Sequence, residues 1–223
     1  MKVFYLALLS MAMACTSASS FEQEVQTEIN DTLVDLNNQP EEEFENPPAP
    51  DIRMDTLRYL AKQALIYNKT NGLDTIMCIL IDMYRHPGTK RLFVWDFKKD
   101  TVVKAALVSH GSCDEWTDDW RPIFKNVHES NCSSLGKYKT GARVWSSFGV
   151  GFSYKLHGLE STNNLAFDRI IVFHSWAETP DEEVYPEEIT NSWGCPAVSD
   201  NFMLEIDKDI KKSLVDDVFS AVS

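Results

Sequence analysis

Three apolar runs in the first half of the chain restrict the fold more than any other feature of the sequence. They cover residues 75–83, 91–97 and 102–108, and little more than the polar stretch Lys98-Lys99-Asp100 separates the last two. Short apolar runs between polar breaks are typical of strands, and so tight a polar connection is typical of a hairpin. Further strands are predicted at 149–156 and 169–173.

Helical patterns flank the predicted strands at both ends. Apolar residues recur at helical spacing from Met54 to Leu65, Asp51 or Asp55 is the candidate N-cap, and Asn71-Gly72 ends the pattern. Residues 207–222 also alternate apolar and charged residues at helical spacing. The residues expected to face inward there are Ile210, Leu214, Val215, Val218 and Phe219. The sequence therefore predicts a mostly β domain with a helix at either end.

The amino-terminal residues predict export. Lys2 is followed by an apolar run at 3–14 and small residues up to position 20, the pattern of a cleavable signal. The run is too short for a permanent bilayer span, which needs about 20 apolar residues; a buried helix is the weaker alternative. Ala14-Cys15 also resembles a bacterial lipobox, so lipidation of Cys15 and membrane attachment stand beside ordinary cleavage.

An acidic, proline-containing spacer is predicted between the signal and the folded domain. Residues 21–51 hold a cluster of glutamates at 41–45 and three prolines at 47–50, which keep a chain extended. The spacer is either a tether or a segment without a role, and the folded domain is predicted at 52–223. The net charge of −13 repels nucleic acids and anionic lipid headgroups, so no nucleic-acid partner is expected.

The chain has five cysteines and no Cys-x-x-Cys pair, which disfavours a structural zinc site. Cys78 lies in an apolar run and is expected to be a buried hydrophobic residue. Cys113 and Cys132 lie in polar, loop-like surroundings and would be able to form a disulfide in an oxidising compartment. No metal is expected.

Cys195 ends the segment Ser-Trp-Gly-Cys at residues 192–195. Gly194 allows a turn that aims backbone N–H groups at a developing oxyanion. A cysteine is a nucleophile only as a thiolate, so it needs a base, and His174 at the end of a predicted strand is the candidate. Taken alone, either residue is more simply a structural one.

Together, Phe-His-Ser at 173–175 and Ser-Trp-Gly-Cys at 192–195 resemble the signature of the murein L,D-transpeptidase (YkuD-like) catalytic domain. That signature is a strand-end His, a gap, and then Ser/Thr-x-Gly-Cys. Other matching segments follow in order between residues 52 and 199; they include 91–96, 108–111, 134–141, 156–160, 163–164 and 194–197.

The resemblance implies the β-sandwich or mixed-sheet fold of these enzymes, and it implies roles for individual residues. Cys195 would attack a peptidoglycan stem peptide to form a thioester, with His174 as base and no cofactor. An amine acceptor would give a 3-3 crosslink, water would make the enzyme an L,D-carboxypeptidase, and a protein acceptor is a third option. The site-support residues implied are Ser192, Trp193, Gly194 and Ser175. The substrate-binding candidates implied are Arg169, His157 and Tyr138.

The resemblance also implies a bacterial source, a location in the periplasm or cell envelope, and sensitivity to carbapenems. Trp193 and Ala197 depart from the family pattern, which places a His and an Arg there, so Arg169 and Arg143 are the candidates to supply the missing charge. A catalytically degenerate peptidoglycan-binding module is the competing hypothesis. A papain-like peptidase is disfavoured because His174 precedes Cys195.

Overall fold

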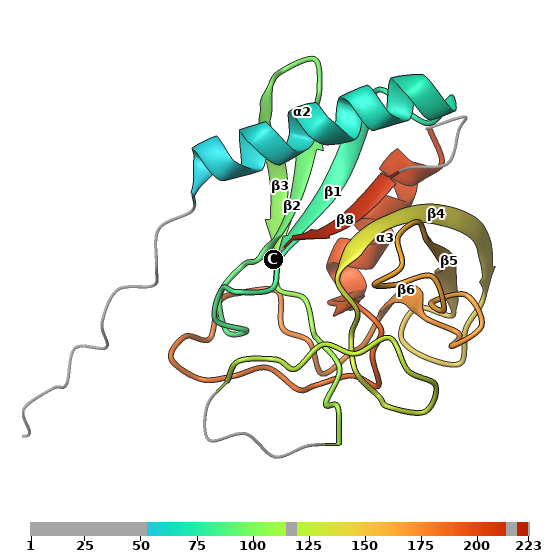
Figure 1. Cartoon of the computed structure of the whole chain (residues 1–223). Helices are drawn as coiled ribbons and strands as arrows, with labels where there is room; N and C mark the ends of the chain where they lie inside the picture. Colours follow the sequence, from blue (N-terminus) through green and yellow to red (C-terminus); the bar gives the residue numbers. More distant parts are fainter. Residues whose placement is uncertain (1–52, 115–119, 213–217, 223) are drawn as a thin grey trace, which may run out of the picture. The chain divides into compact units, whose positions relative to one another are not determined.

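In the described part of the chain, eight strands form one sheet in the order β3-β2-β1-β8-β4-β5-β6-β7 (Figure 1). The computed structural model describes residues 53–114 and 120–212, and the backbone of 218–222. The predicted signal, Cys15 and the spacer lie outside these residues. Within them, no helix combines the length and the apolar character that crossing a membrane requires.

The first half of the sheet confirms the three predicted strands. β1 (Met77–Asp82), β2 (Leu92–Asp96) and β3 (Thr101–Ala106) pair antiparallel in sequence order. The predicted hairpin connects β2 to β3: Asp96 Oδ1 accepts the backbone N–H groups of Lys98 and Lys99 at 2.9 and 2.8 Å. A side chain that caps the turn in this way fixes the strand register, because it satisfies backbone donors that the sheet cannot reach.

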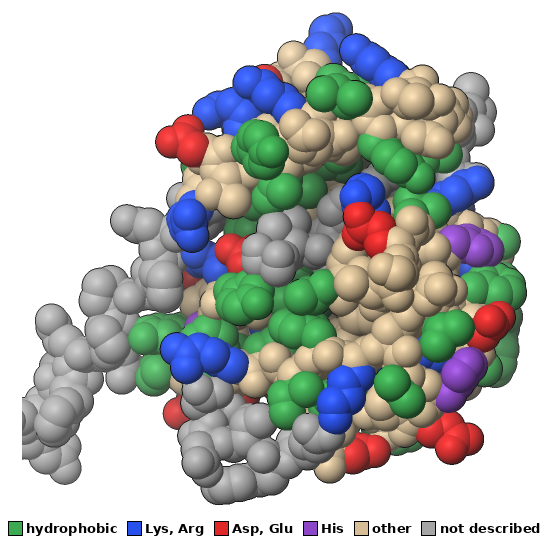
Figure 2. Space-filling view, viewed as in Figure 1, with side chains coloured by type: hydrophobic (Ala, Val, Ile, Leu, Met, Phe, Trp, Pro, Cys, Tyr) green, Lys and Arg blue, Asp and Glu red, His purple; other side chains and the backbone are tan. Residues whose placement is uncertain are grey.

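Helix α2 (Met54–Asn71) covers one face of these strands (Figure 1). Its buried residues pack on alternate residues of β1 and β2; the cluster is Leu57, Ala61, Ala64, Cys78, Leu80, Phe93 and Trp95. Cys78 is fully buried, as expected. Figure 2 shows Lys and Arg side chains along the outer side of this helix.

The predicted C-terminal end of α2 is confirmed, whereas the prediction of Asp55 as its N-cap is wrong. Gly72 ends the helix at φ = 67°, the left-handed conformation that glycine adopts at low cost. The N-cap is Arg53, whose side chain makes no capping hydrogen bond, and Asp55 lies inside the first turn. Asp55 is therefore not the cap, although a carboxylate there still favours the positive end of the helix; Asp51 lies outside the described residues.

The other face of β1 builds the larger core. Successive strand residues point to opposite faces, so Met77, Ile79 and Ile81 face away from α2. They pack with residues of the second half of the sheet and of helix α3 (Asp200–Ile210); among these are Tyr154, Leu156, Phe173, Met203 and Ile206. Burial on both faces explains why β1 reads as an uninterrupted apolar run rather than an alternating one.

The second half of the sheet contains β4 (Gly136–Trp145), β5 (Phe152–Gly158), β6 (Val172–Ser175) and β7 (Ala197–Val198). β4, β5 and β6 pair antiparallel, and β7 pairs parallel to β6. The strand predicted at 169–173 begins three residues late. Ile170 has φ = 60°, a conformation incompatible with a strand. His174, predicted at the strand end, is the second-to-last residue of β6.

The end of the described chain corrects the predicted helix at 207–222. The helix lies earlier, at Asp200–Ile210, and Val218–Val222 forms strand β8. β8 runs parallel to β1 and antiparallel to β4, and thus joins the two halves of the sheet. A short apolar run does not distinguish a helix turn from a strand by periodicity, and here two open strand edges decide the outcome. Leu214 and Val215 lie outside the described residues.

A fully buried arginine, Arg91, fixes the segment that follows β3. Its Nε and Nη2 donate to the Val108 carbonyl at 3.0 and 2.8 Å, and Nη2 also lies 2.8 Å from His110 Nδ1. The guanidinium can only donate, so Nδ1 of His110 is the acceptor and carries no proton. Burial, reinforced by the charge of Arg91, lowers the pKa of His110 to about 3.

We expect this buried neutral histidine to make the fold sensitive to acid. An unfolded histidine takes up a proton near pH 6.5, whereas folded His110 does not do so until about pH 3, so stability falls as the pH drops between these values. The loss assigned to His110 between pH 7 and pH 5 is about 2 kcal/mol. Urea unfolding of the wild type and of His110→Asn, which keeps an acceptor for Arg91, measures it. If the free energy of unfolding falls equally steeply with decreasing pH in the two proteins, the assignment to His110 is contradicted.

Candidate active site

Cys195 lies in a tight turn held by the hydroxyl of Ser192. Ser192 Oγ accepts the N–H of Gly194 at 3.2 Å and donates to the carbonyl of Cys195 at 2.5 Å. Gly194 adopts φ = 103°, where a side chain would be strained, and a Cβ there would lie 2.7 Å from the Cys132 carbonyl oxygen. The sequence Ser-x-Gly-Cys therefore specifies one turn geometry, in which the Gly194 N–H is already occupied.

The turn is anchored to the segment after β3. Ser192 N–H donates to the His110 carbonyl at 2.7 Å, and Ser112 N–H donates to the Ser192 carbonyl at 2.9 Å. Ser133 bridges the same two segments, because its hydroxyl accepts from Gly111 N–H at 2.9 Å and donates to the Gly194 carbonyl at 3.1 Å. The buried Arg91–His110 pair is thereby connected through the backbone to the turn that carries the cysteine.

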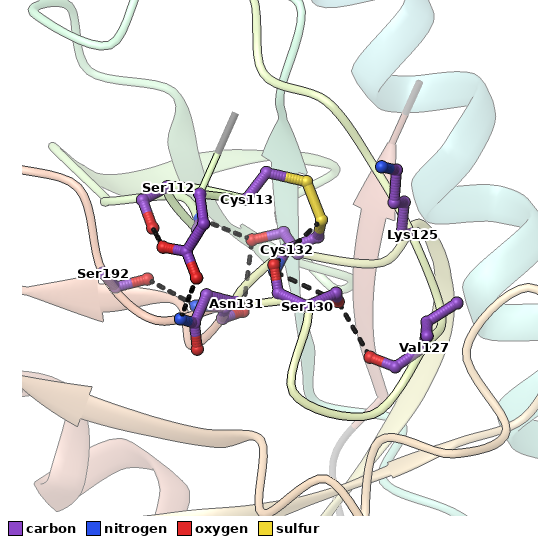
Figure 3. Close-up of a disulfide and its surroundings, with 12 residues drawn as sticks. Ser112, Cys113, Lys125, Val127, Ser130, Asn131, Cys132 and Ser192 are labelled. Carbon is purple, nitrogen blue, oxygen red and sulfur yellow. Dashed lines mark hydrogen bonds between the residues drawn. A yellow bond between two sulfur atoms is a disulfide. The ribbon is translucent and has the colours of Figure 1, made fainter. Parts of the chain in front are cut away.

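Cys113 and Cys132 form a disulfide beside this turn, the pairing that the sequence left open (Figure 3). Figure 3 shows Ser192 next to Ser112 and Asn131, the residues that flank the two cysteines. A backbone hydrogen bond joins the same two segments, because Cys113 N–H donates to the Asn131 carbonyl at 3.2 Å. The disulfide thus closes the segment that carries Ser133 onto the segment that carries Gly111.

Arg169 lies between the disulfide-closed segment and the cysteine turn. Its guanidinium donates to the carbonyls of Lys125 and Cys132, at 3.0 and 2.5 Å, and approaches Ser130 Oγ at 3.4 Å. Its charge also acts on the thiol of Cys195 and opposes the rise of the thiol pKa. Arg169 is therefore close to Cys195, and its guanidinium donates to carbonyls of the protein itself.

The thiol of Cys195 is partly buried and its sulfur contacts the start of β6. Val172 N–H donates to Sγ at 3.4 Å, and the thiol donates to the Ile170 carbonyl at 3.8 Å. Burial raises the pKa of Cys195, while the Val172 N–H and the charges of Arg169 and Lys155 oppose the rise. At neutral pH the thiol is therefore protonated in this state.

His174 is buried and its tautomer is fixed by its neighbour. Nδ1 lies 2.8 Å from the carbonyl oxygen of Ser175, which can only accept, so Nδ1 carries the proton and Nε2 carries the lone pair. Burial lowers the pKa of His174, against the effect of that hydrogen bond, so the ring is neutral at pH 7. The imidazole is thus held in the form that accepts a proton through Nε2.

The pairing of β6 with β7 brings the two segments together. His174 lies opposite Ala197, and its N–H reaches the Pro196 carbonyl at 3.4 Å, so its backbone is beside that of the segment that begins with Cys195. No hydrogen bond joins the two side chains among the described residues. Ala197 is fully buried, so a larger side chain at this position would require repacking.

An exposed aromatic ring, Phe148, contacts His174 and links it to Trp193, and the sequence had drawn attention only to Trp193. The Phe148 ring lies 5.7 Å from the His174 ring and 6.4 Å from that of Trp193. Ser175 holds the Phe148 loop in place by accepting the Val150 N–H at 3.0 Å. Trp193 is 69% exposed, so its ring faces solvent. The loop was unrecognisable from sequence because its approach to the site depends on the long-range Ser175 contact.

Tyr138 and His157 are the other two residues that the resemblance implied for substrate binding. Tyr138 is buried and its phenol donates to the Ser134 carbonyl at 2.6 Å; burial raises its pKa, and the charges of Arg169 and Cys195 also act on it. His157 lies on β5, the strand next to β6, and its ring stacks on that of Phe167 with the ring centroids 4.7 Å apart. The described residues contain no group of three His, Cys, Asp or Glu arranged to hold a metal ion.

Lys155 is the residue near the thiol that sequence reasoning missed. β5 alternates inward Tyr154 and Leu156 with Ser153, Lys155 and His157 on its other face. This alternation was readable in the sequence. What was not readable is the register that sets Ser153 opposite His174 and Lys155 opposite Val172.

Residues 49–216 match the family model described as the L,D-transpeptidase catalytic domain. Among solved structures, the chain is similar to an L,D-transpeptidase from Xylanimonas cellulosilytica, at 12% identity and a TM-score of 0.37 over 70% of this chain and 68% of that one. It is also similar to Bd1075 from Bdellovibrio bacteriovorus, at 14% identity and a TM-score of 0.38 over 68% of this chain and 49% of that one. No curated protein matches the sequence.

The raised pKa of Cys195 predicts slow alkylation at neutral pH. Only the thiolate reacts, so we expect the rate with iodoacetamide to rise with pH, with a midpoint above the value of about 8.5 for an ordinary cysteine. Peptide mapping by mass spectrometry follows each cysteine, and fully buried Cys78 serves as the unreactive internal control. A midpoint below pH 7 would instead show a thiolate already paired with a cation.

The disulfide is expected to stabilise the fold as well as the site. Cys113 and Cys132 are 19 positions apart, and closing a loop of that size contributes about 3 kcal/mol through the entropy of the unfolded chain. The double variant Cys113→Ser/Cys132→Ser should lose this amount in urea unfolding. Added reductant should lower the wild-type midpoint and leave the variant unchanged; a wild type indifferent to reductant would contradict the prediction.

Proposed function

The chain belongs to the L,D-transpeptidase catalytic domain family, and from this premise we propose that it is a transpeptidase with Cys195 as nucleophile and His174 as base. The substrate proposed is a peptidoglycan stem peptide. The bond attacked is the one between the diamino-acid residue and a terminal D-Ala. An amine acceptor yields a 3-3 crosslink and water yields carboxypeptidase activity.

The observation that supports this most directly is the hydrogen bond from His174 Nδ1 to the Ser175 carbonyl, at 2.8 Å. It leaves Nε2 unprotonated, so the ring can take the thiol proton of Cys195 once the thiol turns from the Ile170 carbonyl. The thiolate adds to the carbonyl, D-Ala leaves as an amine after receiving a proton from His174, and a thioester remains. The same nitrogen then deprotonates the incoming amine or water.

Two backbone donors beside the nucleophile are suited to the oxyanion. The N–H groups of Trp193 and Cys195 have no hydrogen-bond partner among the described residues, whereas that of Gly194 is bonded to Ser192. Each donor aimed at a developing oxyanion contributes about 3 kcal/mol to the transition state. Trp193 thus keeps its backbone role although its side chain differs from the family pattern.

We place this activity in the periplasm or cell envelope. The sequence supports this location through the export signal predicted at residues 1–20, with Cys15 as its lipidation candidate, and the spacer predicted at 21–51. The Cys113–Cys132 disulfide supports it as well, because a structural disulfide persists in an oxidising compartment.

One observation favours the alternative of a peptidoglycan-binding module without turnover. Burial raises the pKa of Cys195, and no hydrogen bond to His174 offsets that burial in this state. A thiol that stays protonated after substrate binds would leave a site that holds the wall but does not cleave it.

Intact-protein mass spectrometry with a carbapenem distinguishes the two. The wild type is expected to gain the mass of one drug molecule, Cys195→Ala is expected to gain none, and Cys78→Ala should match the wild type because Cys78 is fully buried. His174→Gln should slow the adduct by a factor of about 100 or more. A wild type that binds purified sacculi yet gains no adduct would establish the module instead.

A further inference from the structure

The two arginines that the sequence offered as sources of positive charge near the cysteine make contacts elsewhere in the protein. Arg143 donates to the Asp207 carboxylate at 2.9 Å and lies over the Phe152 ring at 3.6 Å. Arg169 is bonded to the carbonyls of Lys125 and Cys132. Arg143 is thus paired with a carboxylate of the protein, and Arg169 has donors taken by carbonyls of the protein.

Lys155 occupies the right place on the sheet. It lies directly opposite Val172 in the β5–β6 pair, and Val172 is the residue whose N–H donates to Cys195 Sγ at 3.4 Å. Side chains directly opposite one another share a face and have Cβ atoms about 5 Å apart. Ser153, two residues earlier on β5, lies opposite His174, so Lys155 and His174 are on one face of the sheet.

The Lys155 ammonium has no carboxylate partner among the described residues. It forms no ion pair or hydrogen bond with them, and its ring contact is Phe167, 5.8 Å from Nζ to the ring centroid. The side chain is only partly exposed. In a chain with 34 acidic residues and 21 basic ones, the described residues leave this cation without a counter-ion.

We propose that the Lys155 ammonium binds a carboxylate of the substrate beside Cys195 and selects donors that carry it. This rests on the proposed function for the identity of the substrate, a peptide that carries several carboxylates. A lysine offers a single charge on a flexible stem, so it tolerates a carboxylate on either side of the scissile bond. The Phe167 ring lies 5.8 Å from Nζ and attracts the ammonium through a cation–π contact, which helps to position it.

Binding to a turnover-deficient protein provides the test. In a Cys195→Ala background, calorimetry compares the parent, which has Lys155, with Lys155→Met, which keeps the stem but not the charge, and with Lys155→Arg, which keeps the charge. The ligands are a synthetic stem tetrapeptide and versions in which each carboxylate is amidated in turn. Lys62→Met, on the exposed side of α2, is the matched control for losing one positive charge.

We expect Lys155→Met to weaken binding of the unmodified peptide by about 10- to 100-fold, as for loss of one hydrogen bond to a charged group. For one amidated peptide, and only that one, the difference should disappear, so that Lys155→Met and its parent bind it equally. That peptide identifies the carboxylate. Lys155→Arg should retain most of the affinity, and Lys62→Met all of it.

Two results would overturn the proposal: Lys155→Met binding the unmodified peptide as tightly as its parent, or weakening every peptide by one common factor. The second result would mean that Lys155 attracts all the peptides through the overall electrostatic potential of the site and does not bind one particular carboxylate. Failure of the proposed function has a different signature, because the protein with Cys195 intact would then show no turnover and no carbapenem adduct while the Lys155-dependent affinity persisted.

Discussion

Burial of β1 on both faces is the constraint on which the rest of the structure depends. α2 packs on one face through Leu57 and Ala61, and the opposite face contributes Ile79 and Ile81 to the core shared with α3. Both edges of β1 are also paired, one with β2 and the other with β8. The β4–β7 half is thereby held to a rigid centre, and the segments that carry Cys195 and His174 lie on that half.

The candidate site is assembled from backbone contacts more than from side-chain pairs. Ser192 and Ser133 each use one hydroxyl both to accept and to donate, which fixes the turn before Cys195. The Ser175 carbonyl accepts a hydrogen bond from His174 Nδ1 and thereby keeps the proton of the ring on that nitrogen. Buried hydroxyls satisfied on both sides are rigid, because each lost bond leaves an unpaired polar group. These contacts therefore hold the candidate site rigidly around a thiol that burial keeps protonated at neutral pH.

The sequence predicted most strands, the first helix, the disulfide candidates and the residues that the β6–β7 pairing brings together. Those predictions rest on local patterns: apolar runs in β1 and β2, Gly72 after α2, and the order of His174 and Cys195. Two of the failures have a non-local cause. The helix predicted at 207–222 is partly strand because distant edges of β1 and β4 pair with it, and Lys155 was overlooked because its opposite residue is set by register.

The place of β8 in the sheet has a consequence for how the chain reaches this state. β8 follows every other described element in sequence, yet it lies between β1 and β4. A chain made from its amino terminus therefore carries β1–β3 and β4–β7 as separate pieces, each with an open strand edge, until residues 218–222 are available. Native pairing across the middle of the sheet is a late step that depends on contacts distant in sequence. Open edges invite pairing with other chains, so the interval before β8 inserts is when the protein is most exposed to aggregation.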